Sequence, residues 1–224
     1  MQVKQLQKTG GICAILEALI YISAFIVYGG VLMYPSANAN VSERLKFLSD
    51  NQLLLTIINF SSYVLFGILL AVLVVAIHQR LKNYQPVLSK LAFSFGIIWV
   101  GLVIASGMIA NIGLNTVLEI GKTAPEDAML IWSTLSIISE ALGGGNEIVG
   151  GIWVFLISMI TLKHQLFSKP LTFLGIVVGT AGILTIYPLD LFTEIFGITQ
   201  IVWFISVGIA MIRKPAIEPI DEIK

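Results

Sequence analysis

Long apolar stretches alternate along the chain with short segments of charged and polar residues. A membrane-spanning α-helix needs about 20 predominantly apolar residues to cross the hydrocarbon core of a bilayer. We expect six transmembrane helices, at residues 11–34, 53–77, 91–112, 144–162, 171–189 and 195–212. The predicted fold is therefore all-α: a polytopic membrane helix bundle that forms one domain over residues 1–214, followed by a flexible cytoplasmic tail at 215–224.

The apolar stretch from residue 128 to residue 162 is too long for one span. Its 35 residues would extend roughly 52 Å as a helix, whereas the hydrocarbon core is about 30 Å thick. In its first part, Ser133, Ser136 and Glu140 lie opposite an apolar face, which is the pattern of an amphipathic helix. We expect a short interfacial or re-entrant helix at 129–142 before the fourth span. One kinked helix over 129–162 is the alternative.

The composition also indicates a membrane protein. Of the 224 residues, 57% are hydrophobic and only 12% are charged, whereas charged residues make up about 25% of a typical soluble domain. The lipid bilayer is therefore the expected environment. The formal net charge of +0 leaves no excess of basic residues for binding a phosphate backbone, so we expect no nucleic-acid partner.

The distribution of basic residues predicts the orientation, because Lys and Arg concentrate in the cytoplasmic loops of membrane proteins. With the N-terminus in the cytoplasm, ten of the 13 basic residues fall in inner segments, and only Arg44, Lys46 and Lys122 fall in outer loops. An even number of spans returns the C-terminus to the same side. We therefore expect both termini to be cytoplasmic.

Polar residues inside the spans are the candidates for function, because such residues in lipid are costly and usually have a partner or a role. The segment 143–151 carries Asn146 and Glu147 among five glycines. Other candidates for binding a ligand or a proton are Asn59, Asn111, Tyr187, Gln200, Glu17 and Glu140. Several of these lie at a similar depth, so we expect an outer-half polar cavity around Asn146 and Glu147. The alternative is that they form interhelical hydrogen bonds, typically worth about 0.6–2 kcal/mol each.

Two further sets of residues suggest packing and, more weakly, metal binding. Gly175 and Gly179 form a small-x-x-x-small face that favours helix packing or an oligomer, and we expect Trp153 to pack inside the bundle. The weak metal alternative places His78 and His164 at inner span ends with Glu17 as a third ligand, because a catalytic zinc usually has three protein ligands. The spacing does not require such a site, and we expect no metal and no cofactor.

The run Gly-Gly-Asn-Glu-Ile-Val-Gly-Gly-Ile-Trp at 144–153, together with 170–179, 184–188 and 196–204, resembles a family of small bacterial multi-pass membrane proteins. That family is catalogued only as a domain of unknown function. The resemblance implies a bacterial plasma-membrane protein of about six helices and points to Asn146, Glu147 and Trp153. It implies no activity.

These observations favour a non-catalytic membrane protein that binds a small-molecule ligand or a lipid, or that assists a partner. The first alternative is a small proton-coupled permease or exporter that uses Glu147 and Glu17, functioning as a homo-oligomer. The second is an intramembrane metal-dependent hydrolase. An enzyme is the less favoured class, because the sequence holds no Gly-x-Ser-x-Gly, His-Glu-x-x-His or phosphate-binding loop motif.

Overall fold

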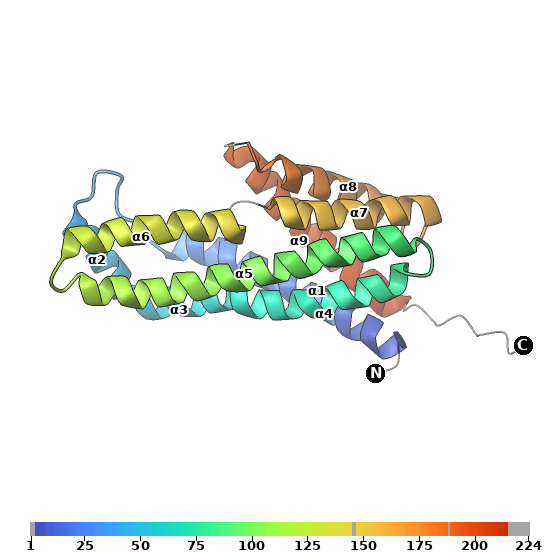
Figure 1. Cartoon of the computed structure of the whole chain (residues 1–224), viewed down its shortest axis with the longest axis horizontal. Coiled ribbons are helices and arrows are strands. Elements are labelled where there is room, and N and C mark those ends of the chain that lie inside the picture. Colours follow the sequence, from blue (N-terminus) through green and yellow to red (C-terminus); the bar gives the residue numbers. More distant parts are fainter. Residues whose placement is uncertain (1–2, 145–146, 188, 215–224) are drawn as a thin grey trace, which may run out of the picture. The chain divides into compact units, whose positions relative to one another are not determined.

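The computed structural model describes residues 3–144, 147–187 and 189–214, and within these ranges it contains helices and no strand (Figure 1). Asn146 and the predicted tail 215–224 lie outside the described residues. The α-helices are α1 (Val3–Ile26), α2 (Val41–Asp50), α3 (Gln52–Asn59), α4 (Phe66–Leu81), α5 (Pro86–Ile120), α6 (Pro125–Ser139), α7 (Ile148–His164), α8 (Lys169–Leu184) and α9 (Asp190–Arg213). Two π-helical segments, Val27–Val31 and Phe60–Leu65, accompany them within the described ranges, and a kinked turn at Glu140–Gly144 follows α6.

Among the described residues, five helical stretches are long and apolar enough to cross a membrane: Val3–Val31, Gln52–Leu81, Pro86–Ile120, Pro125–His164 and Asp190–Arg213. The remaining predicted span corresponds to α8, a shorter apolar helix. Large apolar side chains also face outward, such as Val87 at 81% and Leu130 at 69% exposure, which suits lipid better than water. The predicted all-α fold of membrane-spanning helices is confirmed.

The chain divides into two compact units. Unit 1 comprises Met1–Leu19, Leu69–Trp99 and Glu147–Lys224, and unit 2 comprises Ile20–Ile68 and Val100–Asn146. The boundaries fall inside α1, α4 and α5, so these three helices contribute residues to both units.

Glycines bring α7 and α8 of unit 1 into backbone contact, and Figure 1 shows the two helices side by side. A Cβ atom on Gly151 would lie 2.6 Å from the backbone nitrogen of Ile183, and one on Gly179 would lie 2.7 Å from that of Phe155. Only glycine permits so close an approach. A Cβ on Gly175 would likewise lie 2.8 Å from the indole nitrogen of Trp203. The Gly175/Gly179 face is thus covered inside unit 1 and is not free for a second copy of the chain.

A row of tryptophans fills the centre of unit 1. Trp153 lies between Trp99 and Trp203, with ring centroids 5.7 Å and 5.6 Å away, respectively. All three side chains are 1–2% exposed. Their edge-on and tilted contacts add specific geometry to a large burial of apolar surface.

Unit 2 has its own apolar core, which contains Leu32, Leu48, Leu55, Leu114, Val117 and Ala128. Local signals in the sequence explain where its helices begin. Asn40 and Glu43 form a reciprocal capping box at the start of α2, and Pro125 occupies the first turn of α6.

Gly143 interrupts the long stretch that begins with α6. Its φ of 155° lies in a region that favours glycine, and α7 begins only at Ile148. The 129–162 stretch therefore contains two helices, and its first helix belongs to unit 2 while its second belongs to unit 1.

Replacing Gly179 by Val tests the contact between α7 and α8. The added atoms would meet the backbone of Phe155, which cannot rotate away as a side chain could. We therefore expect the free energy of unfolding to fall by about 1–3 kcal/mol or more. The matched control is Gly101→Ala in α5, where a Cβ meets nothing within 4 Å; this change should stabilise by about 0.5–1 kcal/mol. Thermal unfolding of the purified protein in detergent measures both. Equal stability of the two variants would contradict the backbone contact.

Candidate functional site

The two units divide the polar residues that the sequence analysis singled out. Unit 2 contains Asn59, Asn111 and Glu140, whereas unit 1 contains Glu17, Glu147, Tyr187 and Gln200. Asn146 lies outside the described residues. Neither unit alone holds all the residues of the predicted cavity, so each group is considered within its own unit.

Unit 2 contains a cavity of about 690 Å³, within the range of about 300–1,000 Å³ that is typical of small-molecule sites. Asn59 and Glu140 both line it. Its aromatic lining consists of Tyr28, Tyr34, Phe47, Tyr63 and Trp132. Its other polar lining residues are Arg44 and Ser36, Ser133, Ser136 and Ser139. The polar face of α6 thus faces this cavity, and the cavity combines broad apolar surfaces with a few polar groups.

Each π-helical segment contributes to this lining. Tyr28 belongs to Val27–Val31, Tyr63 to Phe60–Leu65, and Glu140 to Glu140–Gly144. A π-helical turn inserts an extra residue into an α-helix, which redirects the side chains that follow. Such turns are rare in proteins overall, and those that occur are frequently at functional sites. Glu140–Gly144 differs from the other two segments, because it contains a kink at Gly143. The two π-helical segments and this kink each place a side chain on the wall of one cavity.

Tyr28 and Asn59 form the best-defined polar contact of the cavity. The Tyr28 hydroxyl donates a hydrogen bond of 2.7 Å to Oδ1 of Asn59, and the Asn59 side chain is buried. This bond joins α3 to the π-helical turn after α1. It fixes two polar groups on the wall by linking them to each other.

Charged and hydroxyl groups complete the wall. Arg44 donates from Nε to the Ala39 carbonyl at 3.1 Å and from Nη2 to the Ala37 carbonyl at 2.8 Å, so much of its guanidinium group holds the connection before α2. Ser133 and Ser136 donate to carbonyls of their own helix and leave their oxygens as acceptors. Partial burial raises the pKa of Tyr34 above its ordinary value, which keeps this phenol neutral.

Asn111 lies in the same unit but does not line the cavity. Its Nδ2 donates to the backbone carbonyl of Thr56 at 3.2 Å, which ties α5 to α3. Asn111 therefore forms an interhelical hydrogen bond, which is the alternative role considered for these polar residues from the sequence.

Glu147 occupies a different setting in unit 1. Its backbone N–H donates to Oγ1 of Thr185 at 2.9 Å, and the Thr185 hydroxyl donates to the Gly182 carbonyl at 2.7 Å. The Glu147 side chain is 8% exposed, and the indole of Trp99 interacts with its carboxyl group. Its Oε2 has no hydrogen-bond partner within the described part of the chain. Thr185 therefore ties the start of α7 to the end of α8.

Glu17 and Gln200 are fully buried in unit 1, at 0% exposure. Neither the Glu17 carboxyl oxygens nor the Gln200 amide atoms have a hydrogen-bond partner among the residues described. The antiparallel helices α1 and α9 meet at Gly11 and Gly208. Measured from there, Glu17 lies roughly 9 Å along α1 and Gln200 roughly 12 Å along α9 in the same direction, so the two residues share a level. Tyr187, by contrast, is 58% exposed.

The weak prediction of a metal site is wrong for these residues. Over residues 3–144, 147–187 and 189–214, no group of three or more His, Cys, Asp and Glu residues could hold a metal ion. His78 contacts Ser89 Oγ through Nδ1 at 2.9 Å, and His164 lies beside Gln85 and Tyr84. The level of His78 on α1 is marked by Gln7, whose side chain donates a hydrogen bond to the carbonyl of Ala76, two residues before His78 on α4. Glu17 lies roughly 15 Å further along α1.

Sequence reasoning found Asn59 and Glu140 but missed Tyr28, Tyr63, Arg44 and Trp132. The aromatic residues stand inside apolar stretches and look like ordinary membrane residues. Arg44 was assigned only to an outer loop. The π-helical turns that aim Tyr28 and Tyr63 have no recognised signal in the sequence.

Long apolar helices with outward-facing apolar side chains define the chain as a multi-pass α-helical membrane protein. Residues 9–215 match the family described as Domain of unknown function (DUF4386), and the chain belongs to that family. No curated protein and no solved structure matches the chain. The membership agrees with the resemblance seen in residues 144–204 and, like it, assigns no activity.

Replacing Thr185 by Val tests the link between α7 and α8. The variant would leave the buried N–H of Glu147 without its acceptor, which typically costs about 1–3 kcal/mol. The control Thr185→Ser keeps the hydroxyl and should lose much less. Unfolding midpoints in detergent compare the two variants. Equal unfolding midpoints for Thr185→Val and Thr185→Ser would show that the hydroxyl group does not link α7 to α8.

Proposed function

We propose that this protein is a non-catalytic, ligand-binding membrane protein and that the cavity of unit 2 is its ligand site. The observation that carries this proposal is the convergence on that cavity of two π-helical segments, Val27–Val31 and Phe60–Leu65, and of the kink at Glu140–Gly144. Departures from α-helical geometry weaken backbone hydrogen bonding and are uncommon without a functional reason. Glu140 and Asn59 carry over from the sequence prediction as binding residues. Glu147 has a structural role at the start of α7.

The lining favours an amphipathic organic cation, such as a small molecule with an apolar body and a protonated amine. Aromatic faces attract cations, and five aromatic residues line the cavity. Glu140 supplies a carboxylate, and the ion pairs found among the described residues, Lys46–Asp50 and Glu119–Lys122, do not involve it. Arg44 also lines the cavity and keeps its positive charge, but its Nε and Nη2 donate to the Ala39 and Ala37 carbonyls, which hold the guanidinium group against the connection before α2.

We further propose that the protein resides in a bacterial plasma membrane with both termini in the cytoplasm. The basic residues support this orientation, since ten of the 13 fall on one side of a six-span arrangement. The cavity then faces the outer half of the bilayer, because the segments before α2 and α6 become outer loops. A ligand would reach it from outside the cell or from the outer leaflet.

Binding of dansylcadaverine, a fluorescent primary amine, tests the proposal. The purified full-length protein should bind the probe with energy transfer from Trp132, which lines the cavity. Glu140→Gln should weaken binding about tenfold, because it removes the carboxylate but little volume, and a tenfold change corresponds to about 1.4 kcal/mol. N-acetylated dansylcadaverine, which has no charge, should bind the wild type and Glu140→Gln equally.

Asp127→Asn is the matched control, since Asp127 is an exposed acid on α6 that does not line the cavity. It should bind the amine as the wild type does. Ala110→Trp, which places a large ring in the cavity, should abolish binding of both probes. Unchanged binding to Ala110→Trp would show that the probes bind elsewhere and would overturn the proposal.

Proton-coupled transport is a second candidate, and the fully buried Glu17 favours it. Ionisable residues enclosed within membrane spans commonly mark proton pathways, and the described residues offer neither Glu17 oxygen a hydrogen bond. Protein reconstituted in liposomes that contain pyranine should then dissipate an imposed pH gradient. Glu17→Gln should abolish the dissipation, and Glu194→Gln, at an exposed residue of α9, should not. Equal rates in the wild type and in empty liposomes would eliminate this candidate.

A further inference from the structure

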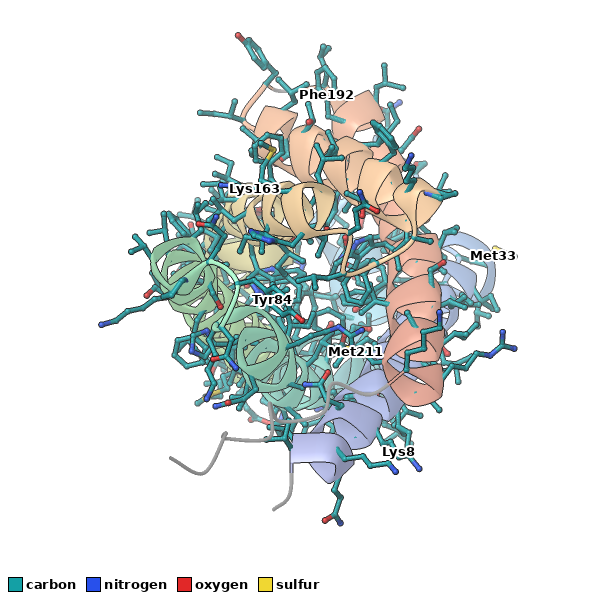
Figure 2. All side chains as sticks on the ribbon, turned by 90° about the vertical axis from the view of Figure 1, so that its right-hand side faces the viewer. Lys8, Met33, Tyr84, Lys163, Phe192 and Met211 are labelled. Atoms are coloured by element: carbon teal, nitrogen blue, oxygen red, sulfur yellow. The ribbon has the colours of Figure 1, made fainter. Side chains whose placement is uncertain are left out.

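Unit 1 contains a second cavity, of about 820 Å³, between α8, α9 and the connection that precedes α8. Its polar part is formed by Arg80, Arg213, Lys214, Gln165, Ser168 and Ser206. The cavity lies where α4, α7 and α9 end and where α8 begins. Figure 2 looks onto this end of the unit, where Tyr84, Lys163 and Lys8 are labelled.

The cavity is strongly cationic. Arg80, Arg213 and Lys214 line it, and none of the described lining residues is acidic. Both ion pairs found within the described ranges belong to unit 2 and leave these three cations unpaired. Arg213 and Lys214 are exposed and Arg80 is partly buried, so the lining offers an entering anion three positive charges.

Arg80 is held in place as part of the cavity floor. Its Nη1 donates to the Lys214 carbonyl at 2.8 Å, and its guanidinium carbon lies 5.1 Å from the centre of the Phe167 ring. Longer hydrogen bonds run from Nη1 to Gln7 Oε1 at 3.4 Å and from Nη2 to the Leu166 carbonyl at 3.5 Å. All these partners are neutral groups, so they orient the charge without neutralising it. An anion in the cavity would therefore meet a positioned guanidinium group.

The backbone at the start of α8 adds to this preference for an anion. Ser168 precedes the helix without a side-chain capping bond, and both Ser168 and Pro170 line the cavity. The first backbone N–H groups of a helix are unsatisfied and attract phosphate. The helix start thus presents its positive end to the same hollow.

The other part of the lining is apolar and consists of Leu171, Leu174, Val202, Ile209 and Ala210. Val202 is 49% and Ile209 is 38% exposed, so the apolar wall continues onto the outer surface of α9. A free phosphate would use none of this surface. A lipid would use both parts, with its headgroup on the cations and its acyl chains along α8 and α9.

We propose that this cavity binds an anionic phospholipid, with the phosphate held by Arg80, Arg213 and Lys214. The site suits a phosphodiester with a small headgroup, such as phosphatidylglycerol. Basic pockets between helices at the cytoplasmic side are suited to anionic headgroups, and the predicted orientation places this end of unit 1 there. The site is separate from the ligand cavity of unit 2 and does not depend on it.

Native mass spectrometry of the full-length protein in detergent tests the proposal by titration with phosphatidylglycerol or phosphatidylcholine. The wild type should retain phosphatidylglycerol at least tenfold more tightly than phosphatidylcholine. Each basic residue near a membrane surface contributes about fivefold to binding an anionic lipid, so Arg213→Gln/Lys214→Gln should weaken phosphatidylglycerol binding about 25-fold. Its affinity for phosphatidylcholine should not change.

The control Lys82→Gln/Lys90→Gln removes two exposed cations of unit 1 that do not line the cavity, and it should bind as the wild type does. The charge-conserving variant Arg213→Lys/Lys214→Arg should also retain binding, which separates loss of charge from loss of fold. Equal affinity for the two lipids would overturn the proposal. Complete displacement of phosphatidylglycerol by millimolar inorganic phosphate would also overturn it, since the site would then recognise the anion alone.

Discussion

Backbone polar groups inside a bilayer have no water to bind, so a membrane helix keeps its hydrogen bonds within itself. Departures from α-helical geometry are tolerated where the backbone is buried in protein or where it lines a water-filled cavity. The π-helical segments Val27–Val31 and Phe60–Leu65 and the kink at Glu140–Gly144 are such departures, and one cavity adjoins all three. The proposed ligand site of unit 2 depends on this constraint, because an uninterrupted helix would turn Tyr28 and Tyr63 in other directions.

Unit 1 is organised on a different principle. Lipid gives helices no hydrophobic reason to associate, so close packing of small residues has to hold them together. Gly151, Gly179 and Gly182 let α7 and α8 touch along their backbones, and the hydroxyl of Thr185 joins the ends of the same two helices. The close contact between α7 and α8 gives Gly151 a packing role, whereas the predicted functional role of Glu147 stays a prediction.

Hydropathy was sufficient for the fold, because a helix that faces lipid must be apolar along a length set by the bilayer. Asn59 and Glu140 were also within reach, since a polar residue in an apolar stretch is conspicuous. The sequence places residues at a depth along a span but does not tell which face they occupy. Depth alone was therefore the basis for predicting one cavity for Glu147 and Asn59, which belong to different units. The aromatic wall was invisible for a second reason, since Tyr28 and Trp132 do not stand out among membrane residues.

The most direct test of the ligand cavity is an experimental structure of the full-length protein in lipid nanodiscs with bound dansylcadaverine, determined by cryo-electron microscopy. The expected result is π-helical geometry at residues 27–31 and 60–65 and a kink at Gly143, with density for the amine beside Glu140 and for the aromatic rings against Trp132. Regular α-helical geometry through these segments, with side chains filling the space between α3, α5 and α6, would contradict the assignment of this cavity as a ligand site.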